Sequence, residues 1–165
     1  MSILFLAHRL PFPPDRGDKI RAHHLLKALA KLAPVHVGCF AESERDLTHV
    51  PELAALAQSH CVPLRKTGNV IPGLRALASG RTVSEAAFDS GDLRRWVERT
   101  VAERAVDTIV VFSGQMGQFV PTDFAGRLVI DLCDVDSAKF EAYAETGSFP
   151  RQWINAREGR LLKRM

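Results

Sequence analysis

The chain has 165 residues, of which 46% are hydrophobic and 25% are charged, a composition typical of one soluble globular domain. Its formal net charge of +3 is small and dispersed, which disfavours a nucleic-acid partner but is compatible with an anionic small molecule. No apolar run approaches the length of a membrane span, and the 3 cysteines lie far apart in apolar stretches, as reduced core thiols do. We therefore expect a cytoplasmic protein.

The first half of the sequence alternates apolar runs with segments of helical spacing. The predicted strands cover Ser2–Ala7, Pro34–Phe40 and His60–Arg65, and the predicted helices cover Asp18–Ala33 and Pro51–Gln58. Because proline lacks an amide donor, Pro63 places the third strand near an edge of the sheet.

The second half continues this alternation. Residues 68–91 hold two helical fragments, and the later elements are helices over Asp92–Ala105, Val135–Glu145 and Pro150–Met165 and strands over Asp107–Phe112 and Arg127–Leu132. Apolar strands separated by helices pair in parallel through crossover connections. The sequence therefore predicts an α/β fold, a doubly wound Rossmann-like parallel sheet forming a single domain over residues 1–165.

Ligands of such sheets bind beyond the carboxyl ends of the strands, where the strand order reverses. The loop after the first strand lacks the G-x-G-x-x-G fingerprint, which disfavours an NAD-type oxidoreductase, and we expect no cofactor. Three prolines stiffen this loop, which presents Arg16 and the Gly17 amide beside a helix N-terminus, an arrangement that suits a phosphate or a sugar hydroxyl. Asp18 is the predicted N-cap of that helix, a role that does not prevent it from lining a site.

Other polar residues follow the first, fourth and fifth strands. His8, directly after the first strand, is either a packed histidine or a ligand contact. The turn after the fourth strand offers Ser113, Gly114 and Gln115, which can bind hydroxyls or simply form a strand-to-helix turn.

The loop after the fifth strand contains Asp134 and Asp136. Either residue can line the same site or cap the next helix. No second carboxylate cluster accompanies them, so we expect no metal site.

Two stretches carry a family resemblance: "ILFLAHRLPFPPDRGDKIRAHHLLKAL" and "VIDLCDVDSAKFEAYAETGSFPRQWINAREGRLLKRM". Together they resemble the amino-terminal domain of GT-B fold, retaining glycosyltransferases of family 4. Within that family the chain is most similar to the sugar transferases associated with exopolysaccharide biosynthesis and PEP-CTERM sorting. Residues Pro13–Arg21 carry the more specific part of the likeness.

The resemblance implies transfer of a sugar from a nucleotide-sugar donor to a glycan or lipid-linked acceptor. It also implies that this half binds the acceptor and covers the donor diphosphate with its first loop. Gly17 would then permit close approach, Arg16 and Lys19 would supply charge, and Asp18 would cap the helix or accept from an acceptor hydroxyl. The donor-binding carboxyl-terminal domain is absent from this chain, so we expect the chain to be inactive alone, with unassigned catalytic residues.

Two alternatives remain open. The chain could instead be a noncatalytic sugar- or nucleotide-binding module of similar fold, which an open reading frame beyond codon 165 would argue against. The helix at residues 150–165 mixes cationic and apolar side chains, which suits either packing on a second domain, the interpretation we favour, or peripheral contact with the inner face of an anionic membrane.

Overall fold

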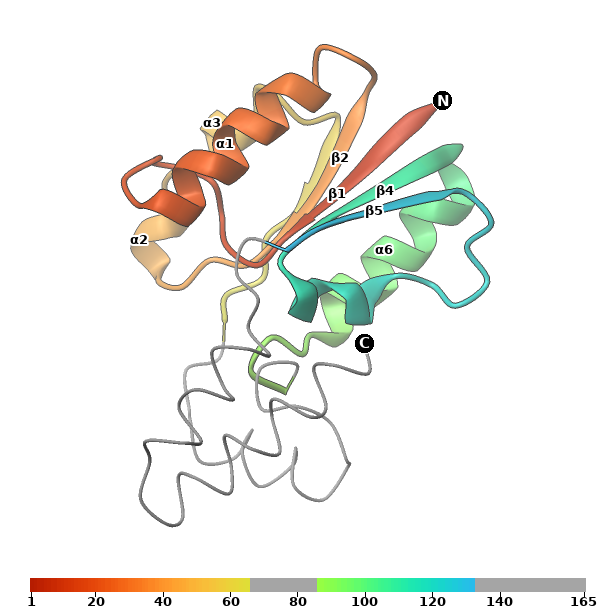
Figure 1. Cartoon of the computed structure of the whole chain (residues 1–165). Helices are drawn as coiled ribbons and strands as arrows, with labels where there is room; N and C mark the ends of the chain where they lie inside the picture. The colour runs from red at the N-terminus through yellow and green to blue at the C-terminus, as the bar shows by residue number, and fades with distance from the viewer. Residues whose placement is uncertain (66–85, 133–165) are drawn as a thin grey trace, which may run out of the picture.

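The computed structural model describes residues 1–65 and 86–132, and these residues form a five-stranded sheet of order β3-β2-β1-β4-β5 (Figure 1). All four strand pairings are parallel. The strands are β1 (Ser2–Ala7), β2 (Val35–Cys39), β3 (Ser59–Cys61), β4 (Val106–Phe112) and β5 (Arg127–Asp131). The α/β class and the parallel sheet predicted from the sequence are thereby confirmed.

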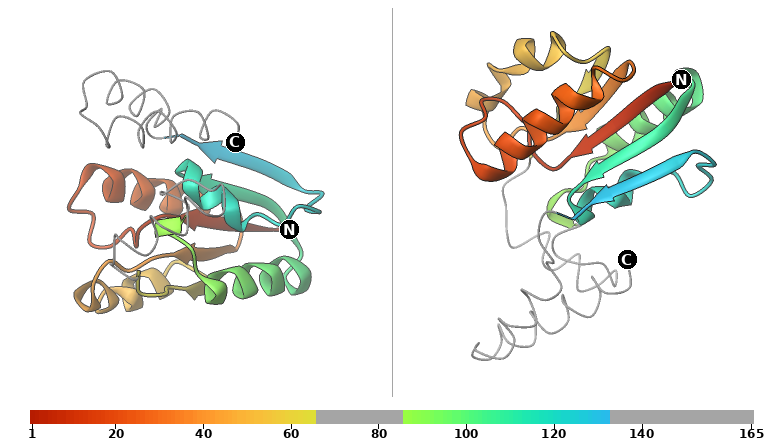
Figure 2. Two further views of the ribbon diagram at one scale, coloured as in Figure 1. Left: turned by 90° about the horizontal axis from the view of Figure 1, so that it is seen from below. Right: turned by 45° about the horizontal axis from the view of Figure 1, so that its top comes forward.

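Helices cover both faces of this sheet. They are α1 (Gly17–Leu29), α2 (Glu44–Leu47), α3 (Val50–Ala54), α6 (Gly91–Glu103) and the 3₁₀ helix η1 (Gly114–Phe119). Figures 1 and 2 show α1 and α6 on opposite faces. The three-layer arrangement explains why β1 and β2 are buried along their whole length, and β4 along its second half, rather than in alternation.

β1 is the centre of the core because both of its faces are covered. All six of its residues are buried. Phe5 belongs to the apolar cluster under α1, whereas Leu4 and Leu6 belong to the cluster under α6. The pleat therefore divides one strand between two cores.

The helices follow the predicted apolar spacing with two corrections. α1 buries Ala22 and Leu26 but ends at Leu29 rather than at the predicted Ala33, so Leu32 lies outside the helix and is 73% exposed. The helix predicted over Pro51–Gln58 is present as α3 but ends earlier, at Ala54, and α2 precedes it in the polar stretch after β2.

The strand order reverses between β1 and β4. From β1 the chain adds β2 and β3 on one side, and β4 and β5 lie on the other. β3 lies at an edge, as Pro63 predicted. The predictions for residues 68–85 and 133–165, including Asp134 and Asp136, lie outside the described residues.

Candidate functional site

The first loop and the turn after β4 leave the sheet side by side. Ala7 at the end of β1 is in register with Phe112 at the end of β4, so His8 and Ser113 follow adjacent strand ends. Phe112 is in register with Asp131 at the end of β5. We call this end of the sheet, where the strands finish, the carboxyl edge. The beginnings of the three predicted loops thus meet at one edge, at the point where the strand order reverses.

His8 is held at the carboxyl edge by aromatic rings. Its residue exposure is 8%, its ring stacks on Phe112 with centroids 5.9 Å apart, and Phe88 meets it edge-on at 6.0 Å. Nε2 lies 3.3 Å from Asp18 Oδ2, whereas Nδ1 is buried without a hydrogen-bond partner among the described residues. Burial, together with the charge of Arg9, lowers the pKa of His8, so the ring is neutral at pH 7.

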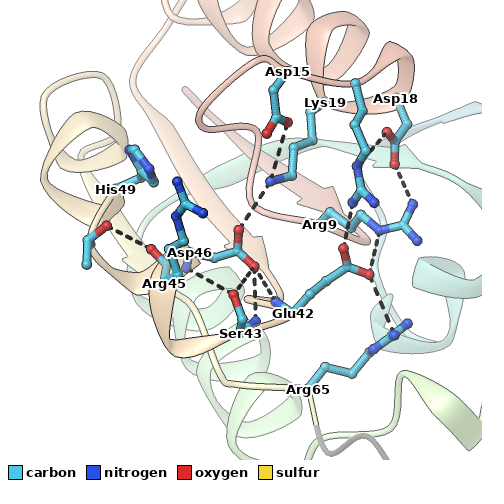
Figure 3. A network of polar contacts seen from close by, with 12 residues as sticks. Arg9, Asp15, Asp18, Lys19, Glu42, Ser43, Arg45, Asp46, His49 and Arg65 are labelled. Atoms are coloured by element: carbon cyan, nitrogen blue, oxygen red, sulfur yellow. Dashed lines mark hydrogen bonds and ion pairs between the residues drawn. The ribbon is translucent and has the colours of Figure 1, made fainter.

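Arg9 lies between two carboxylates, Asp18 from α1 and Glu42 from the segment after β2 (Figure 3). Its Nη1 donates to Asp18 Oδ2 at 2.5 Å, and its Nε lies 2.8 Å from Glu42 Oε1. Burial would raise the pKa of both carboxyls, but the hydrogen bonds and charge of Arg9 outweigh it and hold both values below their usual range. Both acids are therefore ionised at neutral pH.

Glu42 also forms ion pairs with two further arginines. Arg16, at the end of the first loop, places Nη2 2.5 Å from Oε2, and Arg65, after β3, places Nη2 3.5 Å from Oε1. One carboxylate thus joins the first loop, the exit of β2 and the exit of β3. Apart from the position of Glu42 shortly after a predicted strand, nothing in the sequence indicates this role, because the residues that Glu42 contacts are distant in the chain.

Lys19 is the buried cation of the carboxyl edge. Its side chain is 5% exposed, and its Nζ lies 3.2 Å from Asp46 and 3.8 Å from Asp15. Asp46 also forms a capping box with Ser43 at the start of α2 and accepts from the amide of Glu42. The ion pair between Lys19 and Asp46 therefore holds α1 against α2.

The start of α1 differs from the prediction. The N-cap is Arg16 rather than Asp18, and no side chain caps the helix. Asp18 lies inside the first turn, where Arg9 and His8 contact its carboxylate. Gly17 faces open space, since a Cβ built there would meet nothing within 4 Å. The first turn of α1 therefore remains accessible beside the ion pairs.

Ser113 sits in a strained backbone conformation directly after β4. Its φ is 81°, which a residue with a side chain adopts at a cost of about 1–3 kcal/mol. Its amide donates to the Asp131 carbonyl at 3.0 Å, and its hydroxyl donates to Gln115 Oε1 at 2.6 Å. Gly114 begins η1 at the same turn. This part of the carboxyl edge therefore offers hydroxyl and amide groups without charge.

Arg21 joins α1 to the end of β5. Its Nη2 lies 2.8 Å from Asp131 Oδ1 and 3.0 Å from Oδ2, and its Nε donates to Oδ2 at 3.2 Å. Arg21 is 59% exposed, so this is a surface contact. It extends the polar surface from the first loop to the far side of β4.

The other end of the sheet is different in character. An open cavity of about 700 Å³ lies between α6 and the segment before β5, and its lining includes Val106, Gly126 and Phe124. Among residues 1–65 and 86–132, no group of three His, Cys, Asp or Glu side chains is placed to hold a metal ion. Within the same ranges, no helix is long and apolar enough to cross a bilayer.

Comparison of the chain with protein-family models, with curated proteins and with solved structures finds no match. The class that the structure defines is an α/β protein with an open parallel sheet and a polar surface at its order reversal. The function is argued from that surface, because a fold shared by many proteins does not fix an activity.

Proposed function

We propose that the chain is the amino-terminal, acceptor-side domain of a retaining, GT-B type glycosyltransferase of the exopolysaccharide-associated group in family 4. Two features support the proposal. The sheet is open, parallel and reversed between β1 and β4, as a Rossmann-like domain requires. The segment Pro13–Arg21, which carries the family resemblance, lies at the carboxyl edge of that sheet, where α1 begins.

The observation that carries the proposal is the meeting of two loops at the reversal point. The first loop brings the carboxylate of Asp18, and the turn after β4 brings Ser113 and Gln115. Carboxylate, hydroxyl and amide groups are the partners that sugar hydroxyls use for hydrogen bonding. Gly17, which has open space in front of it, lets a ligand approach the start of α1.

The groups that this chain supplies indicate which substrate each domain of the transferase would bind. A second domain would bind the nucleotide of the donor, and this domain would hold the glycan or lipid-linked acceptor with its reacting hydroxyl at the carboxyl edge. The sugar would pass to that hydroxyl with retention of configuration, in a cytoplasmic reaction at the inner face of the membrane. His8 and Asp18 would position the acceptor, and no residue of this chain is assigned as a nucleophile.

The test is a transfer assay with the protein encoded by the complete reading frame. Radiolabelled uridine and guanosine diphosphate sugars are supplied with a bacterial lipid extract, and a labelled lipid-linked product is expected. The 165-residue chain alone should show neither transfer nor appreciable nucleotide-sugar binding in a calorimetric titration. Tight binding of a nucleotide sugar by this chain, with no transfer by the complete protein, would instead identify a noncatalytic binding module.

A further inference from the structure

We propose that Glu42 is a specificity-determining residue of the carboxyl edge, which neutralises the arginines of the first loop and so reserves that loop for an uncharged, hydroxyl-rich ligand. The identity of the ligand as a glycan rests on the proposed function. The exclusion of anions rests on ion-pair geometry alone.

The geometry makes Glu42 the shared partner of three cations. Arg9 and Arg65 approach its Oε1 at 2.8 and 3.5 Å, from the first loop and from the segment after β3 (Figure 3). Arg16, also of the first loop, approaches its Oε2 at 2.5 Å. The Glu42 side chain is 21% exposed. The contacts with Arg9 and Arg65 are partly shielded from water and salt, so they are stronger than those of a fully exposed pair, whereas the contact with Arg16 is exposed.

The charges around Glu42 balance. Within the described ranges, we define the edge network as a set of cations and carboxylates joined by contacts of 3.9 Å or less: Arg9, Arg16, Lys19, Arg65, Asp15, Asp18, Glu42 and Asp46. Each cation of the edge network contacts at least one carboxylate. The neutral ring of His8 adds no positive charge. A diphosphate entering the edge network would have to displace a carboxylate from an arginine.

This arrangement changes the role expected for the loop cations. The family resemblance implies that Arg16 and Lys19 supply charge to a donor diphosphate, yet Arg16 pairs with Glu42 and Lys19 is buried against Asp46. A neutral hydroxyl faces no such competition, since it can accept from the exposed side of Arg16 or donate to Asp18 without separating an ion pair. The charge of the donor diphosphate would then be neutralised by groups outside the edge network.

The test asks whether the chain binds an anion more tightly when the Glu42 carboxylate is removed. Inorganic pyrophosphate is titrated calorimetrically, at low salt, into the wild-type chain, Glu42→Gln and the matched control Glu44→Gln. The control removes the same charge from an exposed position two residues away. We expect Glu42→Gln to bind pyrophosphate at least tenfold more tightly than the other two, with an affinity that falls as salt is added.

Two further variants secure the interpretation. Asp18→Asn removes the other carboxylate of Arg9 and should produce a smaller gain, which keeps the proposal testable if Glu42→Gln fails to fold by circular dichroism. Adding Arg9→Gln to Glu42→Gln should reduce the gained binding. A merely structural role for Glu42 predicts lost stability but no gain of binding.

Some outcomes would overturn the proposal. These are tight pyrophosphate binding by the wild-type chain, or equal binding by Glu42→Gln and Glu44→Gln. The titration does not depend on sugar transfer, so a gain of binding without transferase activity in the complete protein would refute the proposed function and leave the anion-excluding role of Glu42 intact.

Discussion

The carboxyl edge has a charged half and an uncharged half, and they are held in place by different means. The charged half, residues 8–19, is fixed by ion pairs to Glu42 and Asp46, both distant in the sequence, and Glu42 is held in turn by Arg65. The uncharged half, residues 113–118, is fixed by hydrogen bonds within its own turn, by the bond from Ser113 to β5, by a bond from Arg94 of α6 to the Gln118 carbonyl and by the buried side chain of Met116. The first half therefore depends on ion pairs with other elements, whereas the second depends on hydrogen bonds and apolar packing.

The difference shows how the carboxyl edge can be held rigidly and still be open to a ligand. Ion pairs order the first loop while leaving its net charge near zero, and the turn after β4 contributes polar groups that carry no charge. A surface of this kind suits a ligand recognised by its hydroxyls more than one recognised by its charge.

We expect the largest effect on stability when the buried cation of the charged half, Lys19, loses its partner. Asp46→Ala removes the partner of Lys19 and the capping box of α2, and we expect it to lower the free energy of unfolding by about 3 kcal/mol. Urea denaturation measures the change. Glu44→Ala, in the same short helix but exposed, should change it by less than about 0.5 kcal/mol, and an equal loss in both variants would contradict the anchoring role.

Acid should weaken the charged half in two stages. Burial lowers the pKa of His8 below 6.5, so the unfolded chain binds the extra proton and stability falls as the pH decreases below 6.5. The pKa values of Asp18, Asp46 and Glu42 are also lowered, from 3.8, 3.8 and 4.5, so a second loss begins as the pH falls through these values. Urea titrations between pH 7 and pH 3 measure both stages.

The two stages can be separated by substitution. His8→Gln should reduce the first stage, to which His23 and His36 also contribute because burial lowers their pKa values, and it should leave the second. Glu42→Gln should flatten part of the second stage. A stability that rises as the pH falls from 7 to 5 would mean that His8 is stabilised in its charged form.

A smaller effect tests the backbone of the uncharged half. Ser113→Gly should raise the free energy of unfolding by about 1 kcal/mol, because the strain that glycine relieves at a positive φ outweighs the loss of the hydroxyl's bond to Gln115. Ser113→Ala keeps the strain and loses the hydroxyl's bond to Gln115, so it should lower stability by about 1 kcal/mol. If both variants are destabilised equally, the hydroxyl rather than the strain dominates this turn.

The smallest effect is expected at the contact that connects the far side of the edge to α1. Arg21 and Asp131 form an exposed pair, so a double-mutant cycle with Arg21→Ala and Asp131→Asn should give a coupling of about 0.5 kcal/mol. The coupling should shrink in high salt. A coupling above about 2 kcal/mol would mean that this contact belongs with the buried pairs rather than with the surface.

The sequence predicted the alternating parallel fold because apolar runs and segments of helical spacing follow one another, but apart from Pro63 it did not distinguish a central strand from an edge strand. "SILFLA" and "RLVID" are both apolar runs, yet β1 is fully buried and Leu128, Val129 and Ile130 on β5 are 44–48% exposed. The composition of a strand shows which of its side chains are apolar enough to be buried. The order of the strands decides what it does bury, and that order depends on contacts across the chain.

The candidate site, like the fold, was predictable only in part. His8 and Ser113 could be placed at one edge from strand ends alone, since parallel strands finish together. The pairing of Arg9 with Glu42 could not be predicted, because the two residues come from separate loops whose approach depends on β1 and β2 being neighbours. The predicted cap of α1 is wrong because the helix begins at Gly17, one residue before Asp18, so Arg16 occupies the cap position.

The most direct test of the central claim is to block the carboxyl edge and the opposite cavity separately in the complete protein. Gly17→Trp fills the open space in front of α1, and Ala102→Trp adds the same side chain at an exposed position on the cavity beside α6. With both variants folded, we predict that Gly17→Trp abolishes sugar transfer and that Ala102→Trp retains it. Transfer that survives Gly17→Trp and is lost in Ala102→Trp would contradict the account.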